Sequence, residues 1–278
     1  MKINRIEIND LNSPEMEVFF KLKEVQLYRY YEPDPGIFMA ESANVALMAL
    51  AAGYEPLALL AENERFDRAA LPVLEKIAEI FGTEFQEHLP VYTADSQVVE
   101  NVTGYAIVKG LWTAFRRKPL EGLEEFCRGR KKLAVLVDIE KPTNVGAIIR
   151  SAAALGADGV ILTKSSIDPL TRRASRVSMG TVFQIPWTVA EGAEDIVRIL
   201  TDNGFTTIAM ALNNDSVSLT KETRFSDEKA AVLMGNEGYG LPASVIDACS
   251  VSAKIPMYNS VDSLNVAAAS ALAFFCIF

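Results

Sequence analysis

Three polar segments in the second half of the chain contain residue types that could carry chemistry. The first, PTNVGAIIR, places Asn144 and Arg150 less than two turns apart on a predicted helix. The free backbone N–H groups of a first helical turn favour an anion, and the Arg150 guanidinium could reach a phosphate or carboxylate there. A capped helix with a solvated arginine explains the same residues equally well.

The second segment, GNEGYGL, places Glu237 within a glycine-rich turn. Its order, Gly-x-x-Gly-x-Gly, reverses the dinucleotide-binding fingerprint and gives little support to a Rossmann phosphate turn. The third, PMYNSVDSLNVAAASALAFF, offers Ser263, predicted as a helix N-cap, and Asn265 at the helix start. Taken singly, a simple turn and a capped core helix are the more economical explanations. Taken together, the three segments predict a single site.

The elements before these segments decide where the segments meet. Each segment follows a predicted apolar strand, at 133–138, 231–234 and 251–255. In open parallel sheets, ligands bind past the carboxyl ends of the strands. We therefore expect the polar residues of all three segments at one edge of one sheet.

Strands and helices alternate throughout residues 131–278. Continuous apolar strands joined by crossover helices predict an α/β domain with a parallel sheet buried on both faces. The remaining elements expected here are strands at 159–163, 182–187 and 206–211, and helices at 144–155, 170–177, 193–203, 242–248 and 264–275.

Residues 1–118 show an alternation of their own and predict a smaller α/β domain. A linker is expected over 119–130, where charged residues, Pro and Gly mix. In this first domain we expect helices at 14–24, 42–52 and 71–81, and strands at 36–40, 57–61, near Val91 and at 105–108.

Composition excludes several classes of protein. The single histidine, His88, and the three distant cysteines, Cys127, Cys249 and Cys276, lack the spacing of a metal site, and the cysteines are expected to be reduced bystanders. No apolar run reaches about 18 residues, and the N-terminus lacks the features of a signal peptide. We therefore expect a cytoplasmic protein that uses no metal and no membrane.

The charge distribution bears on a polyanionic partner. The chain has a net charge of −9, which argues against one, since nucleic-acid binding depends on Lys and Arg neutralising phosphates. Residues 116–176, however, hold 13 Lys/Arg against 7 Asp/Glu. The basic excess therefore surrounds the first polar segment.

In this order and spacing, the three segments resemble the three motifs of the SpoU (TrmH) family of RNA 2′-O-ribose methyltransferases, of the SPOUT class. The likeness covers about residues 131–278, and its matching stretches are NVGAIIRSAAALGADGV, VLMGNEGYGL and IPMYNSVDSLNVAAASAL. The stretch IFMAESANVALMALAAGYEPLALL is similar to the RNA substrate-binding domain often found ahead of this catalytic domain. Two departures are Ala267, where many relatives have Ser, and Ser42, where Gly is frequent.

The resemblance implies a trefoil knot after Met234 that holds S-adenosylmethionine, and a homodimer formed through the C-terminal domain. Carried over position by position, it places the cofactor against Leu212, Gly235, Ile255, Met257 and Leu264. It places at the reacting centre Asn144, Arg150, Glu237, Ser263 and Asn265. The candidates for gripping RNA within the basic excess are Arg116, Arg117, Lys118, Arg128, Arg130, Lys131, Lys132, Arg172, Arg173 and Arg176.

Two points of mechanism stay open at this stage. An arginine stays protonated above pH 12, so we expect Arg150 to grip the substrate phosphate rather than to accept a proton. Glu237 either pairs with Arg150 or orders the glycine-rich loop through backbone N–H groups. Ribosomal RNA is the expected substrate. The alternatives are transfer RNA, a catalytically silent RNA-binding or assembly protein with this fold, or a nicotinamide-dependent oxidoreductase, which lacks its glycine turn here.

Overall fold

The computed structural model describes residues 2–8, 10, 13–32, 34–103, 110–213, 215–220, 223, 225 and 228–278. The chain folds into two compact units, one of Met1–Pro119 with Leu170–Phe183, the other of Leu120–Pro169 with Gln184–Phe278. Residues 170–183 thus pack with the first unit, although alternation along the chain had placed them in the second domain. The reason is side-chain packing: helix α10 (Arg172–Val177) lies against strand β2 (Ile37–Glu41).

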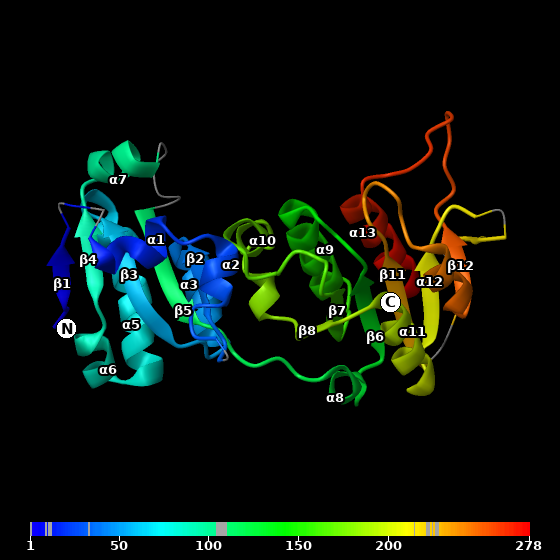
Figure 1. The fold of residues 1–278 in the computed structure, drawn as a ribbon, viewed down its shortest axis with the longest axis horizontal. Coiled ribbons are helices and arrows are strands. Elements are labelled where there is room, and N and C mark those ends of the chain that lie inside the picture. The colour runs from blue at the N-terminus through cyan, green and yellow to red at the C-terminus, as the bar shows by residue number, and fades with distance from the viewer. Residues whose placement is uncertain are drawn as a thin grey trace. The chain divides into compact units, whose positions relative to one another are not determined.

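The first unit contains a mixed five-stranded sheet in the order β1-β4-β3-β5-β2 (Figure 1). Strands β1 (Arg5–Glu7), β3 (Pro56–Glu62) and β4 (Val91–Ala94) pair in parallel, and β5 (Leu111–Arg116) runs antiparallel to both β3 and β2. The strands expected at 36–40, 57–61 and near Val91 are present. Strands β1 and β5 were not predicted from the sequence, and the strand expected at 105–108 lies outside the described residues.

Short helices cover this sheet. Helix α5 has the predicted bounds, whereas the helix expected at 14–24 is a 3-10 turn and a short helix α1, followed by an extended Lys23. The helical elements of the unit are η1 (Pro14–Met16), α1 (Glu17–Phe20), α2 (Glu24–Tyr28), α3 (Ala43–Ala51), η2 (Asn63–Arg65), α4 (Phe66–Ala69), α5 (Leu71–Phe81), α6 (Thr83–His88), α7 (Ser96–Thr103), α10 and η4 (Thr181–Phe183). Ser42, before α3, has φ +92°, a conformation that favours glycine.

The second unit is built on a seven-stranded sheet in the order β10-β12-β9-β11-β6-β7-β8, and every neighbouring pair is parallel (Figure 1). This confirms the α/β fold class and the parallel sheet. The strands are β6 (Lys132–Leu136), β7 (Gly159–Thr163), β8 (Trp187–Ala190), β9 (Thr206–Met210), β10 (Val217–Ser218), β11 (Ala230–Met234) and β12 (Val251–Lys254).

Two groups of helices pack on this sheet. Helices α8 (Leu123–Cys127), α11 (Ala193–Asp202) and α12 (Ala243–Ala248) share a core with alternate residues of β6 and β11. Helices α9 (Pro142–Ala154) and α13 (Val266–Ile277) pack against each other, α9 also against β7 and α13 against β11 (Figure 1). Strand β11 lies in the middle of the sheet, between β9 and β6, so the loop that leaves it emerges at the centre of one edge.

One predicted strand of the second half is wrong. Residues 182–187 were expected to be extended, but β8 begins only at Trp187. Pro186 has no N–H group to donate to a β-ladder, so the strand starts after it. The trefoil knot stays a prediction. Within the described ranges, no helix has the length and apolar character to cross a membrane.

Candidate functional site

A cavity of about 630 Å³ lies at the carboxyl ends of β9, β11 and β12. Its wall is formed by residues that follow these three strands, as expected for an open parallel sheet. All five positions predicted for the cofactor line this one cavity: Leu212, Gly235, Ile255, Met257 and Leu264. Three of the predicted reacting-centre residues, Glu237, Ser263 and Asn265, lie on the same wall. The predicted convergence of the strand-end loops is therefore observed for these residues.

The glycine-rich loop closes on itself immediately after β11. Asn236 and Gly240 exchange two backbone hydrogen bonds of 3.1 and 3.0 Å. A Cβ atom on Gly235 would lie 2.4 Å from the carbonyl carbon of Gly240 and from the nitrogen of Leu241, so only glycine fits there. The loop is therefore narrow and bounded by backbone on both sides.

A chain of hydrogen bonds joins the three polar segments. The Glu237 carboxylate accepts a hydrogen bond of 2.7 Å from Asn144 Nδ2 and longer ones from the backbone N–H groups of Lys141, at 3.3 Å, and Glu140, at 3.4 Å. Asn144 Oδ1 in turn accepts from Asn265 Nδ2 at 3.3 Å. Residues from the β11 loop, from α9 and from the start of α13 are thus held in one polar network.

The starts of α9 and α13 differ from the predicted ones. Asn144 is not a helix cap, because α9 already begins at Pro142, and proline is tolerated at a first helical position, where its missing N–H is not needed. Ser263 is not the N-cap of α13. Asn265 is, since its Oδ1 accepts a 2.9 Å hydrogen bond from the Ala267 N–H. The Asn265 side chain therefore both caps α13 and binds Asn144.

Arg150 is exposed on α9, outside the cavity wall. Its side chain forms no ion pair or hydrogen bond with any residue that the structure describes. The ion pair considered between Glu237 and Arg150 is therefore absent. The other interpretation of Glu237 is nearer to what is observed, but the N–H groups it binds belong to the turn before α9 rather than to its own loop.

The surroundings of Glu237 also shift its acidity. Burial alone raises the pKa of this carboxyl, but the hydrogen bonds from Asn144 and from backbone N–H groups outweigh burial, and the pKa is lowered from 4.5. A carboxylate with a lowered pKa stabilises the fold above its unfolded-state pKa. That stabilisation is lost as the pH falls through the folded-state value.

Replacing Glu237 by Gln is therefore expected to destabilise the chain at pH 7, because one amide N–H would face the N–H of Glu140 or Lys141. The difference in unfolding midpoint between wild type and Glu237→Gln should shrink as the pH falls from about 7 to below about 4.5, measured by urea unfolding. The matched control is Glu191→Gln, whose carboxylate is 79% exposed and, within the described part of the chain, pairs with Lys164 alone. If Glu237→Gln lowers the unfolding midpoint by the same amount at both pH values, the stabilising role assigned to the Glu237 carboxylate is contradicted.

Two residues that the sequence analysis missed support the same loop. Asn236 is buried, and its Nδ2 donates a 2.7 Å hydrogen bond to the backbone oxygen of Asp138. Asp138 has φ +55°, and its carboxylate accepts from the hydroxyl groups of Thr163 and Ser165. The available signal was the position of both residues: each lies two residues past the end of a strand, and each is a residue type that binds backbone groups in turns.

The side chains of eight of the ten cations proposed to grip RNA already bind a carboxylate or a backbone carbonyl within their own unit. Arg117 is buried and donates to the Ile37 carbonyl, Arg176 binds Glu41 at 2.7 Å, and Arg172 donates to the Phe19 carbonyl. The other five with intrachain partners are Arg116, Lys118, Arg128, Arg130 and Lys132. The exposed side chains of Lys131 and Arg173 have none among the described residues. The structural ties of Arg117, Arg172 and Arg176 argue against a primary role in binding RNA.

The residues set aside in the sequence analysis stay away from this network. Burial raises the pKa of the Cys249 thiol to about 11 and raises that of Cys127 as well, so both thiols are protonated near neutral pH. The His88 ring contacts the Glu84 carbonyl at 2.7 Å in the first unit. Over the described ranges, no group of three His, Cys, Asp or Glu side chains is arranged to hold a metal ion.

Comparison with known proteins adds to this geometry. The model of the SpoU rRNA methylase family matches residues 131–275. An uncharacterized tRNA/rRNA methyltransferase of Mycobacterium bovis is 31% identical over 270 residues, covering 97% of this chain and 90% of that protein. A putative TrmH family tRNA/rRNA methyltransferase of Staphylococcus aureus is 33% identical over 150 residues, 54% of this chain and 59% of its own.

Solved structures resemble the whole chain. The crystal structure of an rRNA methyltransferase from Sinorhizobium meliloti has a TM-score of 0.78 and 25% sequence identity, and the match covers 98% of this chain and 96% of that one. The same values of TM-score and identity apply to an AdoMet-bound rRNA methyltransferase from that organism. Both units of the present fold are included in these matches.

Proposed function

The chain belongs to the SpoU rRNA methylase family, and from that premise we propose that it methylates a ribose 2′-hydroxyl of ribosomal RNA. The enzyme class is RNA 2′-O-ribose methyltransferase, and S-adenosylmethionine is the methyl donor. The finer assignment, to ribosomal RNA, is supported by the Sinorhizobium meliloti structures, which are of rRNA methyltransferases.

The observation that carries the proposal at the level of residues is the single cavity shared by the five predicted cofactor positions. At about 630 Å³ it has the size of a cofactor site. Leu212, Met257 and Leu264 offer an apolar wall, whereas Gly235 and its neighbours offer backbone groups that can approach a ligand closely. These residues fit S-adenosylmethionine, which when bound supplies an electrophilic methyl group on a sulfonium.

We assign different tasks to the reacting-centre residues according to which hydrogen-bonding groups they have left. Asn144, Glu237 and Asn265 are positioning residues, since their side chains bind one another and nearby backbone groups. The side chains of Arg150 and Ser263 have no hydrogen-bond partner among the described residues, so we assign them the contacts with RNA. Arg150 grips a phosphate, Ser263 orients the ribose, and the phosphate or water receives the hydroxyl proton.

We further propose that the protein acts as a homodimer through α13. Ala268, Leu272 and Phe275 are spaced along one exposed side of this helix, and Leu272 and Phe275 are 45% and 65% exposed. A contiguous exposed apolar stripe indicates an interaction surface, and the family resemblance selects a second copy as its occupant.

Sedimentation of the wild-type protein at micromolar concentration is expected to give about twice the mass of the 30.4 kDa chain. Leu272→Lys with Phe275→Lys should shift the protein to monomer, because each lysine places a charge on the apolar stripe. Ile80→Lys, which alters a 39% exposed residue on α5, is the control and should leave the mass unchanged. A monomeric wild-type protein at tens of micromolar would contradict the dimer.

Calorimetry separates this function from its alternatives. Binding of S-adenosylhomocysteine at the cavity, with no binding of NAD, is the expected result. Binding of NAD alone would support the oxidoreductase. Binding of neither ligand would support a catalytically silent RNA-binding protein.

A further inference from the structure

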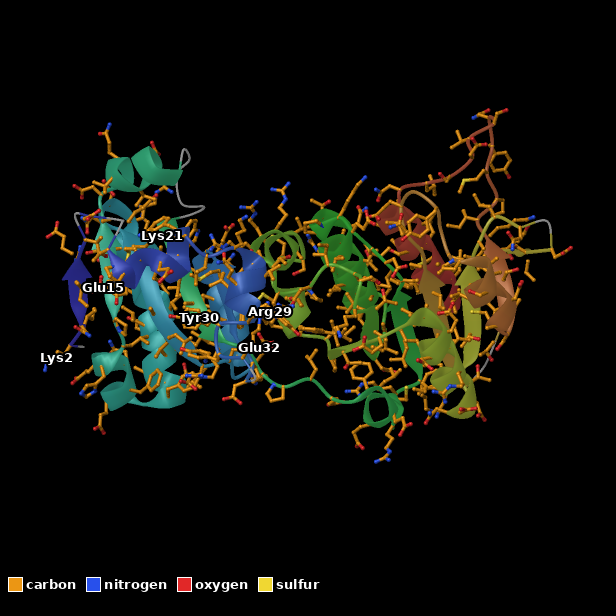
Figure 2. The ribbon with its side chains drawn as sticks, viewed as in Figure 1. Lys2, Glu15, Lys21, Arg29, Tyr30 and Glu32 are labelled. Carbon is orange, nitrogen blue, oxygen red and sulfur yellow. The ribbon has the colours of Figure 1, made fainter. Side chains whose placement is uncertain are left out.

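A surface rich in exposed tyrosine lies on the first unit, on α2 and the segment that follows it. Val25, Tyr28 and Tyr30 are 64%, 53% and 45% exposed, and Arg29 between the tyrosines is exposed as well. Figure 2 shows Arg29, Tyr30 and Glu32 on this one segment. Three large exposed side chains within six residues form a patch that the cavity in the second unit does not use, so it needs a separate explanation.

Each of two tyrosine rings is supported by an arginine. The Arg117 guanidinium lies 4.9 Å from the centroid of the Tyr28 ring, and Arg117 itself is fixed, being 7% exposed with its Nε bound to the Ile37 carbonyl at 3.0 Å. The Arg116 guanidinium lies 4.7 Å from the Tyr31 ring, which Tyr30 meets edge-on. A cation therefore covers part of the Tyr28 ring, while about half of the residue stays open to solvent.

The backbone holds this segment in place. The N–H groups of Tyr30, Glu32 and Asp34 donate to the carbonyls of Leu27, Arg29 and Tyr31 in consecutive turns. Gly36 packs so closely that a Cβ there would lie 2.1 Å from the Tyr28 carbonyl oxygen. The tyrosines are thus presented on an ordered segment, and a preorganised surface loses little entropy when it binds.

Cations lie beside the tyrosines. Arg29 separates Tyr28 from Tyr30 in the sequence, and the Arg117 and Arg116 guanidinium groups lie against the Tyr28 and Tyr31 rings. The acids of the segment are Glu24, Glu32 and Asp34, and Glu24 is paired with Arg172 at 3.7 Å, as Glu55 is with Arg116 at 3.6 Å. Aromatic faces interleaved with cations are the arrangement that binds single-stranded nucleic acid, since bases stack on the rings and cations neutralise the backbone. Paired bases are stacked within a helix and cannot use such faces.

We propose that Tyr28 and Tyr30 stack unpaired bases of the RNA substrate, with Arg29 and Arg116 meeting the adjoining phosphates. This inference rests on the proposed function for the identity of the polymer as RNA. It adds that the substrate offers a single-stranded region to the first unit. It also assigns different roles to Arg116 and Arg117. Arg117 supports the Tyr28 ring, whereas Arg116 faces both the Tyr31 ring and solvent.

The test uses the full chain and two fluorescein-labelled probes, an unstructured pyrimidine-rich 12-nucleotide RNA and a 12-base-pair RNA duplex, with binding followed by anisotropy. The wild-type protein should bind the single strand more tightly than the duplex. Tyr28→Ala with Tyr30→Ala should weaken single-strand binding by about tenfold or more and duplex binding by less than about twofold. Tyr28→Phe with Tyr30→Phe keeps the rings and should stay within about twofold of wild type.

Three results would overturn the inference: a double alanine variant that binds the single strand like wild type, a wild-type preference for duplex, or a double phenylalanine variant as weak as the alanine one. Calorimetry with S-adenosylhomocysteine on each variant reports the second unit independently. If the double alanine variant binds both S-adenosylhomocysteine and RNA like wild type, only the role of the tyrosines in RNA binding is refuted. If the wild-type protein does not bind S-adenosylhomocysteine, the proposed function is refuted instead.

Discussion

Replacing Arg150 by alanine is expected to reduce methyl transfer about 100-fold while leaving the affinity for S-adenosylhomocysteine within about twofold. The Arg150 side chain is exposed and has no ion pair or hydrogen bond within the described chain, and it does not line the cavity. Its loss should therefore remove a contact to RNA without disturbing the cofactor wall. A hydrogen bond to a charged group contributes about 1.5–3 kcal/mol, and 2.7 kcal/mol corresponds to about 100-fold in rate.

Two variants sharpen this prediction. Arg150→Lys keeps the charge but loses the planar fork that binds a phosphate through two hydrogen bonds, so it should retain part of the activity with an altered dependence on salt. Arg68→Ala removes an exposed arginine from α4 and should transfer methyl groups at the wild-type rate. Activity of Arg150→Ala equal to that of wild type would remove Arg150 from the site.

Gly235→Ala is expected to weaken binding of S-adenosylhomocysteine by about 30-fold or more. The added Cβ would lie 2.4 Å from Gly240 C and Leu241 N and 2.6 Å from Gly240 O. These are backbone atoms, so the glycine-rich loop must open to admit the methyl group. Overpacking of this kind costs about 1–3 kcal/mol or more, and the displaced loop forms part of the cavity wall.

Gly238→Ala in the same loop is the matched control. The contact nearest to a Cβ there is Asn236 Oδ1 at 3.4 Å, an ordinary van der Waals distance. The affinity of Gly238→Ala for S-adenosylhomocysteine, measured by calorimetry, should stay within about threefold of wild type. Equal losses in the two variants would mean that an added methyl group weakens binding at either glycine, and the specific crowding at Gly235 would lose its significance.

The sequence predicted the place of the site better than the contacts inside it. Strand ends and turn residues are local features, and parallel topology brings strand ends to one edge, so the loops after 231–234 and 251–255 could be expected together. Leu212 was predicted through the family resemblance. The sequence did not predict which side chain binds Glu237. Asn144 and Arg150 lie on the same helix, and only the three-dimensional register of the β11 loop against the start of α9 selects Asn144.

The helix starts and the domain assignment show the same limit. Ser263 and Asn265 are both good capping residues, and the path of the chain into α13 decides between them. Helix α10 follows β7 in the sequence, yet the bond from Arg176 to the buried Glu41 ties it to the first unit. Alternation along a chain carries no information about such a distant partner.

The most direct test of the account is ribose-methylation mapping of total RNA from cells with and without the gene. We expect a 2′-O-methylated nucleotide in ribosomal RNA that disappears when the gene is deleted, returns with the wild-type gene, and does not return with Arg150→Ala. Loss of a modification in transfer RNA alone would contradict the assignment to ribosomal RNA. An unchanged ribose-methylation pattern in every RNA would contradict the proposed reaction itself.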